Sequence, residues 1–273
     1  MKSKRFIALA VLLVFVGSLV AGCGSDGKAI KIGAFYPLTG SNAIKGQFNK
    51  NGTQLAIDDI NAKGRVLGKQ IQIVYEDTQS KRENVPNVVR KLVENDKVVA
   101  LLGEVASSSS IAAGPVVKQF GIPTIAPTST NVRVTLDPTD NTKINPYYFR
   151  ACFIDPLQGA VLSNFGLKNL GKKKAAILYN ISADYNKALA QVFRENWTKA
   201  GGEILVEESY PDQTQDFKPQ LTKIKNSNPE VVMIPNTYAE NGLILKQAAE
   251  LGLKTTFLLG DASHAPKLSL IHI

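Results

Sequence analysis

The stretch VVALLGEVASSSSIAAGPVV (Val98–Val117) joins a continuous apolar run to four consecutive serines and then to a second apolar run. A short, uninterrupted apolar run that ends in a turn predicts a buried strand. The serines, Ser107–Ser110, open a predicted helix. Two interpretations of them are open. They could cap the helix by accepting bonds from its free amides, or they could help those amides bind an anion at the positive end of the helix dipole.

Strand and helix patterns alternate on both sides of this stretch, which predicts an α/β fold with parallel sheets and helices on both faces. A loop rich in Pro, Asp, Asn and Thr (127–146) interrupts the alternation, so we expect two lobes, 29–146 and 147–267. The predicted strands are Ala29–Phe35, Lys69–Asp77, Val98–Gly103, Ile122–Pro127, Lys174–Asn180, Glu203–Tyr210, Glu230–Asn236 and Thr255–Asp261. The predicted helices other than the serine-led one lie near 44–61, 85–93, 189–200, 217–226 and 241–251.

The N-terminus has the pattern of an export signal. Three basic residues lie within the first five positions, and Phe6–Val20 is apolar or small throughout. This combination is typical of a secretory signal peptide, and the run is short for a stable membrane span. The following LVAGC (Leu19–Cys23) resembles the lipobox of bacterial lipoproteins, which implies removal of residues 1–22 and lipidation of Cys23. Residues 23–28 are then a flexible tether.

Composition and charge exclude several classes of protein. The chain is 44% hydrophobic and 20% charged, as expected of a folded domain. Loss of residues 1–22 removes three positive charges and no negative ones, so the net charge falls from +9 to +6. No dense basic tract follows, which argues against nucleic acid as a partner. Cys152 is then the remaining cysteine, so no internal disulfide is expected. The two histidines, His264 and His272, do not make a metal site.

Candidate motifs for phosphate binding and nucleophilic catalysis lack the neighbouring residues or the strand–helix order that these functions require. GCGSDG (Gly22–Gly27) precedes a strand, whereas a dinucleotide fingerprint follows one. GLKNLGKK (Gly166–Lys173) has lysine where a phosphate-binding loop needs Ser or Thr, and it connects helix to strand in the wrong order. No G-x-S-x-G elbow surrounds the serines, and no histidine is placed to act as their base. An enzyme is therefore the less favoured class, and no cofactor is expected.

Polar residues gather where the predicted strands end, which is where ligands bind in open α/β sheets. The first lobe supplies hydroxyls and amides, and the second supplies an acid and two aromatic hydroxyls. These groups complement a zwitterion, because neutral donors suit a carboxylate and an acid suits an ammonium. The predicted ligand-binding residues are Ser107, Ser108, Thr128, Ser129, Thr130, Tyr185, Tyr238 and Asp261.

Long motifs in order resemble the leucine/isoleucine/valine-binding family, the type I substrate-binding proteins of ABC transporters. They include IKIGAFYPLTGSNA, LLGEVASSSS, PTIAPTSTN, YYFRACFIDPLQG and LLGDASHAPKL. The resemblance covers about Ile30 to Leu268. It implies that Ser107, Thr130 and the Thr128 backbone hold an α-carboxylate. By the same resemblance Asp261 receives the α-ammonium, and Tyr185 and Tyr238 contribute from the second lobe.

The resemblance also implies a fold and a function. The fold is the type I periplasmic-binding-protein fold, with two Rossmann-like lobes joined by a hinge. The function is capture of an amino acid, with Leu, Ile or Val expected, and delivery to a transporter permease. The protein is then a monomer, lipid-anchored and facing the periplasm or cell exterior. Alternatives in the same fold are a receptor for an amide, urea or aromatic acid, or a ligand sensor.

Departures from the family pattern fall at two positions and at the C-terminus. Lys45 stands where many relatives have a tyrosine near the ligand, and Ser263 stands where relatives often have a tryptophan. Full-length relatives continue beyond this terminus, so we expect a truncated second lobe. Leu268–Ile273 resembles the translated end of a transposon-derived sequencing adapter, and we expect that hexapeptide to be an assembly artefact.

Overall fold

The computed structural model describes residues 29–265. The predictions made for the signal peptide, the lipidated Cys23, the tether and the adapter-like tail lie outside these residues. Between residues 29 and 265, none of the helices combines the length and apolar character needed to cross a membrane.

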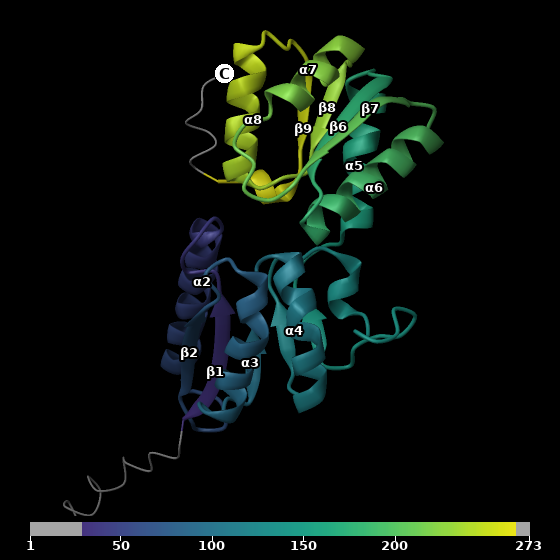
Figure 1. Cartoon of the computed structure of the whole chain (residues 1–273). Helices are drawn as coiled ribbons and strands as arrows, with labels where there is room; N and C mark the ends of the chain where they lie inside the picture. Colours follow the sequence, from purple (N-terminus) through teal and green to yellow (C-terminus); the bar gives the residue numbers. More distant parts are fainter. Residues whose placement is uncertain (1–28, 266–273) are drawn as a thin grey trace, which may run out of the picture.

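The first lobe is a five-stranded parallel sheet with the order β2-β1-β3-β4-β5. Figure 1 shows this lobe with its helices beside the sheet. Its strands are β1 (Ile30–Tyr36), β2 (Ile71–Asp77), β3 (Ala100–Leu102), β4 (Thr124–Ala126) and β5 (Tyr148–Arg150). Its helices are α2 (Ala43–Ala62), α3 (Val85–Glu94) and α4 (Ser107–Phe120).

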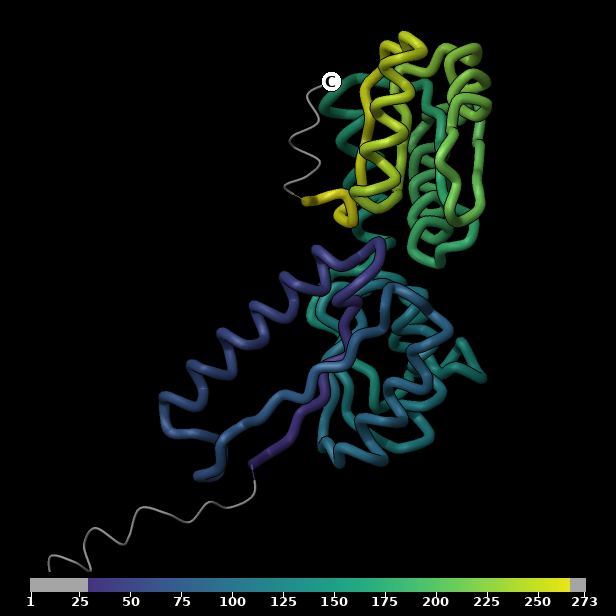
Figure 2. The backbone as a smooth tube through the Cα atoms, turned by 60° about the vertical axis from the view of Figure 1, so that its left-hand side comes forward, coloured from purple at the N-terminus to yellow at the C-terminus, as the bar shows by residue number. Residues whose placement is uncertain are grey.

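The second lobe is a four-stranded parallel sheet with the order β7-β6-β8-β9. The tube in Figure 2 shows it as a separate body stacked on the first. Its strands are β6 (Lys174–Asn180), β7 (Glu203–Tyr210), β8 (Val231–Ile234) and β9 (Thr256–Leu259). Its helices are α5 (Asp155–Asn164), which continues into a π-helical turn at Phe165–Asn169, α6 (Asp184–Lys199), α7 (Lys218–Ser227) and α8 (Tyr238–Glu250). Both lobes confirm the predicted α/β fold.

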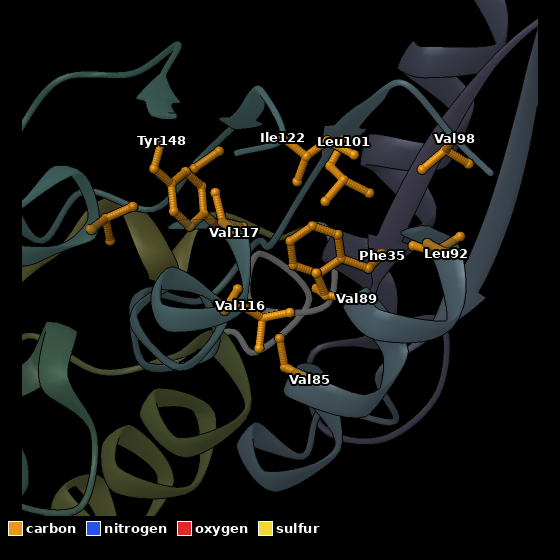
Figure 3. Packing of buried hydrophobic residues seen from close by; sticks show 13 residues of the cluster. Phe35, Val85, Val89, Leu92, Val98, Leu101, Val116, Val117, Ile122 and Tyr148 are labelled. Carbon is orange, nitrogen blue, oxygen red and sulfur yellow. The ribbon is translucent and has the colours of Figure 1, made fainter. Parts of the chain in front are cut away.

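The first lobe has its main core between the sheet and helices α3 and α4. Phe35 and Leu101 point from neighbouring strands toward Leu92 of α3, and Val117 of α4 packs close by (Figure 3). All four side chains are essentially buried. Burial of each such side chain stabilises the fold by about 1.5–3 kcal/mol, so this cluster fixes α4 and its serines at the end of β3.

The second sheet is covered on both faces, as a parallel sheet requires. Alternate residues of β8 face opposite layers. Val232 and Ile234 pack with α7 and α8, and Val231 and Met233 pack with α5 and α6. On the α6 side Trp197 is fully buried and stacks on Phe193 with ring centroids 5.1 Å apart. The two-sided core explains why the β8 sequence is continuously apolar.

Two features near the junction differ from the sequence analysis. β5 pairs with β4 in parallel, with Tyr148 opposite Thr124, so the first sheet includes residues that the boundary after 146 assigned to the second lobe. Helix α5 is not among the predicted helices, because two of its large apolar residues face outward. Leu157 and Val161 are exposed, whereas Gly159 and Ser163 are buried. Helix α5 packs so closely on α6 at Gly159 that a Cβ there would lie 2.6 Å from a Val192 methyl.

Candidate functional site

A cavity of about 300 Å³ lies between the two lobes, at the carboxyl ends of their strands. This volume is at the small end of the range for small-molecule sites. Six of the eight predicted residues line it: Ser107, Ser108, Thr128, Thr130, Tyr185 and Asp261. The other lining residues are Asn42, Lys45, Phe48, Asn49, Val105, Ala106, Ala183, Asn186, Thr237, Ala262 and His264.

The first-lobe wall offers hydrogen-bond donors. Ser107 opens α4, and its Oγ accepts a bond from the Asn131 N–H at 3.2 Å, so its own proton remains available. No described residue accepts a hydrogen bond from the backbone N–H of Thr128 or Thr130. The residue that caps α4 is Ala106, which has no side chain to bond the helix amides. The capping interpretation of the serines is therefore wrong, because they occupy the first turn.

Ser108 and Ser129 have structural partners. The Ser108 hydroxyl lies at the cavity but accepts a bond from the Asp184 N–H of the second lobe at 2.9 Å. Ser129 is not part of the lining, because its fully buried hydroxyl donates to the Glu104 carbonyl at 2.8 Å. Thr128 and Thr130, on either side of Ser129 in the chain, line the cavity, whereas Ser129 does not.

The second-lobe wall offers an acceptor. Asp261 follows β9 and begins a 3₁₀ turn at Asp261–Ser263. One of its oxygens, Oδ1, accepts bonds from the Tyr185 hydroxyl at 2.8 Å and from Gln158 Nε2 at 2.9 Å. Burial and the neighbouring Asp261 raise the pKa of Tyr185, so it remains a neutral donor. The second oxygen, Oδ2, has no hydrogen-bond partner among residues 29–265.

Tyr238 does not line the cavity. It begins α8, and its hydroxyl donates to the Ser41 carbonyl of the first lobe at 3.0 Å. The structure thus gives Tyr238 a bridging contact between lobes in place of the predicted position at the ligand. The first turn of α8 faces the Ser41 loop, which explains why a tyrosine at the end of β8 is aimed across the interface.

Residues of α2 and His264 line the cavity although they are not among the predicted ligand-binding residues. Lys45, Phe48 and Asn49 line the cavity because α2 starts just beyond the carboxyl end of β1. Burial lowers the pKa of the Lys45 ammonium, and the nearby Asp261 partly offsets that shift. The position of α2 in the sequence could have indicated these residues. Like the serines of α4, the first turn of α2 follows a strand of the same sheet and lies at the same edge.

Two buried carboxyl groups, Glu104 and Asp155, are not part of the cavity lining. Burial raises the pKa of Glu104 to about 7, although it accepts bonds from the Thr78 hydroxyl and the Ala106 N–H, each at 2.7 Å. Burial likewise raises the pKa of Asp155 to about 7. Neither carboxylate oxygen of Asp155 has a hydrogen-bond partner in the described part of the chain.

The fold and the cavity together define a class of protein. Two α/β lobes enclose a small cavity that has neutral donors on one wall and a carboxylate on the other. In the described range 29–265 no group of three or more His, Cys, Asp or Glu side chains could hold a metal ion. This arrangement is that of a two-lobed ligand-binding protein.

The chain belongs to the periplasmic binding protein family, whose model matches residues 29–270. The family consists of solute-binding proteins, which agrees with the binding class favoured over an enzyme. A relative described as an amino acid binding protein, from Pseudomonas aeruginosa strain PAO1, is 32% identical over 260 residues. That match covers 95% of this chain and 67% of the relative.

Solved structures agree with this assignment. A leucine binding protein, LivK, from Thermotoga maritima is 34% identical with a TM-score of 0.82, and the match covers 89% of this chain and 66% of that one. The branched-chain amino acid transporter substrate binding protein LivJ from Streptococcus pneumoniae, in complex with isoleucine, is 32% identical with a TM-score of 0.81. The match covers 89% of this chain and 67% of LivJ. The chain therefore spans about two thirds of the length of these relatives.

Proposed function

We propose that this protein is the extracytoplasmic receptor of an ABC transporter and that it captures an α-amino acid between its two lobes. The hydroxyls of Ser107 and Thr130 and the N–H groups of Thr128 and Thr130 would bind the α-carboxylate. The free oxygen of Asp261 would bind the α-ammonium. The ligand would then leave unchanged, because the proposed function includes no covalent step.

The single observation that carries the proposal is the opposite polarity of the two cavity walls. Unused donors line the first lobe, and Asp261 has an unused acceptor on the second. A zwitterionic head group satisfies both at once. The description of the Pseudomonas relative as an amino acid binding protein, and the isoleucine in the LivJ structure, support the same ligand class.

The expected affinity is consistent with a transport receptor. Hydrogen bonds to charged groups contribute about 1.5–3 kcal/mol each, and micromolar binding needs about 8 kcal/mol. Two carboxylate bonds, the pair between the ammonium and Asp261, and a partly buried ligand side chain reach this value after ordering costs. One methylene changes binding by about 1–3 kcal/mol, so discrimination among Leu, Ile and Val would be weak.

Closure would follow from contacts that the ligand makes with both lobes at once. The lobes already share polar contacts at one side of the cavity, where the Asp184 N–H donates to Ser108 and Asn131 Nδ2 donates to the Asp184 carbonyl at 2.9 Å. A ligand that touches both walls binds the closed arrangement better than the open one. It therefore shifts the population toward closure.

The route to the membrane is part of the proposal. Residues 1–22 would direct export, and a lipid on Cys23 would hold the monomeric receptor at the membrane beside its permease. Expression of a Cys23→Ser variant tests the anchor, since the protein should move from the membrane fraction to the soluble fraction. Retention of this variant in the membrane fraction would contradict lipidation at Cys23.

Isothermal titration with a panel of amino acids, starting with leucine, isoleucine and valine, tests the ligand class. At least one amino acid should bind with micromolar or tighter Kd. The matched ligand without its amino group, such as 4-methylpentanoate for leucine, should bind at least tenfold more weakly because Asp261 then lacks its partner. Equal binding of the two would refute the role of Asp261, and no binding of any amino acid would refute the function.

A further inference from the structure

Lys45 brings a cation into the cavity without a partner to neutralise it. Its side chain lines the cavity from α2 and is partly buried. Its ammonium has no hydrogen bond and no salt bridge with any residue between 29 and 265. Burial of a charged group is costly unless the group is paired. An ammonium held in a binding cavity in this state is suited to an anion that arrives with the ligand.

Asp261 is the nearest acidic candidate to pair with Lys45, but it is committed elsewhere. The two groups influence each other electrostatically, yet they form no salt bridge. Asp261 Oδ1 is occupied by Tyr185 and Gln158, and Oδ2 is the acceptor assigned above to the ligand ammonium. When the cavity is filled, Lys45 therefore still needs an anion of its own.

The topology places Lys45 away from the carboxylate donors. Ser107 follows β3 and Thr130 follows β4, whereas α2 follows β1, on the opposite side of β3. Neighbouring strands are about 4.8 Å apart. A carboxylate held between the ends of β3 and β4 thus lies one to two strand spacings from the start of α2. The ligand side chain can span that gap, so Lys45 faces the side-chain end of the ligand.

We propose that Lys45 determines ligand specificity and that the ligand is an α-amino acid whose side chain ends in a carboxylate. The inference rests on the proposed function, because it assumes that the α-carboxylate and α-ammonium occupy the sites described there. Asn42 and Asn49, which line the cavity from the start and first turns of α2, add further hydrogen-bonding groups at this end. A branched aliphatic side chain would leave the partly buried Lys45 without an anionic partner.

Titration calorimetry with L-glutamate, L-aspartate, L-leucine and benzoate tests the inference in three proteins. They are the wild type, Lys45→Met, and the matched control Lys63→Met. Methionine keeps the unbranched side chain and removes the charge. Lys63 lies at the C-terminal end of the same helix, where it is exposed and pairs with Asp59. Its loss should leave the cavity unchanged.

The wild type should bind glutamate or aspartate at least about tenfold more tightly than leucine. Lys45→Met should lose this preference by weakening the acidic ligand at least tenfold while leucine binding stays constant or improves. Lys63→Met should behave as the wild type. Retained leucine binding by Lys45→Met would also show that the variant folds.

Other outcomes would overturn the inference and are separable from failure of the function. A wild-type preference for leucine, or an equal loss of all amino acids in Lys45→Met, would exclude a role at the ligand side chain. Benzoate binding that depends on Lys45, in the absence of amino acid binding, would mean that the lysine replaces the ligand ammonium. No amino acid binding in any of the three proteins would refute the proposed function itself.

Discussion

The two lobes are built from the same strand–helix units, yet they present opposite halves of a binding site. In the first lobe the residues after β3 and β4 are hydroxyls and free amides, which donate hydrogen bonds. In the second lobe the residue after β9 is Asp261, an acceptor held by Tyr185. The scaffold therefore fixes where the site lies, and the few residues after each strand decide its charge.

The lobes also differ in how they bury an acid. Glu104 of the first lobe accepts bonds from Thr78 and Ala106, whereas Asp155 at the start of α5 in the second lobe accepts none. Thr130, Asp261 and Arg150 also influence the pKa of Asp155. Buried polar groups are normally hydrogen-bonded. Asp155, which has no hydrogen-bond partner, is therefore expected to destabilise the folded protein more than Glu104 does.

The largest expected effect comes from Asp155→Asn. The folded-state pKa of Asp155 is about 7, against about 3.9 in an unfolded chain. The folded protein therefore holds a proton that the unfolded chain releases, and the free energy of unfolding of the wild type falls as pH rises from about 4 to about 7. Asparagine does not titrate, so the variant should not lose stability in this way. At about 1.4 kcal/mol per pKa unit, the difference between variant and wild type reaches up to about 4 kcal/mol at high pH.

Urea denaturation at pH 4.5, 6 and 8 checks this. The Asp155→Asn variant should match the wild type at pH 4.5 and exceed it at pH 8. Glu104→Gln is the matched comparison, since Glu104 has the same shifted pKa but two donors aimed at it. At pH 8 the Glu104 carboxylate is largely ionised and accepts both bonds, whereas an amide accepts only one, so Glu104→Gln should gain less over the wild type at pH 8 than Asp155→Asn does. Parallel pH profiles for Asp155→Asn and the wild type would contradict the prediction.

The second-largest effect is expected at Asp261, the acceptor on the second-lobe wall of the cavity. Asp261→Asn should weaken binding of every amino acid by about 1.5–3 kcal/mol, or roughly ten- to a hundredfold, because the ligand ammonium loses its anionic partner. The fold should persist, since the asparagine carbonyl can still accept the Tyr185 hydroxyl. Calorimetry measures the loss, with the exposed Asp216→Asn as control. A loss below about fivefold would remove Asp261 from the site.

A smaller effect is expected on the donor wall. Ser107→Ala and Thr130→Ala should each weaken binding by about 1.5 kcal/mol, the lower end for bonds to a charged group. The loss should be equal for all amino acids, because the α-carboxylate is common to them. Competition binding with several amino acids measures the ratio. Losses that differ between ligands would place these hydroxyls at the ligand side chain.

The smallest expected effect concerns the bridge between the lobes. Tyr238→Phe removes the bond to the Ser41 carbonyl and should reduce affinity by about 0.5–1.5 kcal/mol. All ligands should be affected alike, because the bridge stabilises the arrangement with the lobes together. Tyr147→Phe in the first lobe is the control and should leave affinity unchanged. A large, ligand-dependent loss for Tyr238→Phe would instead return this tyrosine to the cavity wall.

Much of the fold could be predicted from the sequence because parallel strands are continuously apolar and their helices carry clear spacing. Ser107 and Thr130 could be predicted as lining residues because the carboxyl ends of strands meet at one edge. Side-chain direction could not be predicted, so Ser129 and Tyr238 were misplaced. Lys45 and the outward-facing apolar residues of α5 depend on helix rotation and on packing between lobes, which a single sequence does not encode locally.

The two donors on Asp261 lower the entropic cost of using it as an acceptor. A carboxylate already gripped by Tyr185 and Gln158 loses little rotational freedom when a ligand arrives. Preorganised partners of this kind reduce the entropy lost on association. If Asp261 binds the ligand ammonium as proposed, the ammonium meets an acceptor that is already held in place.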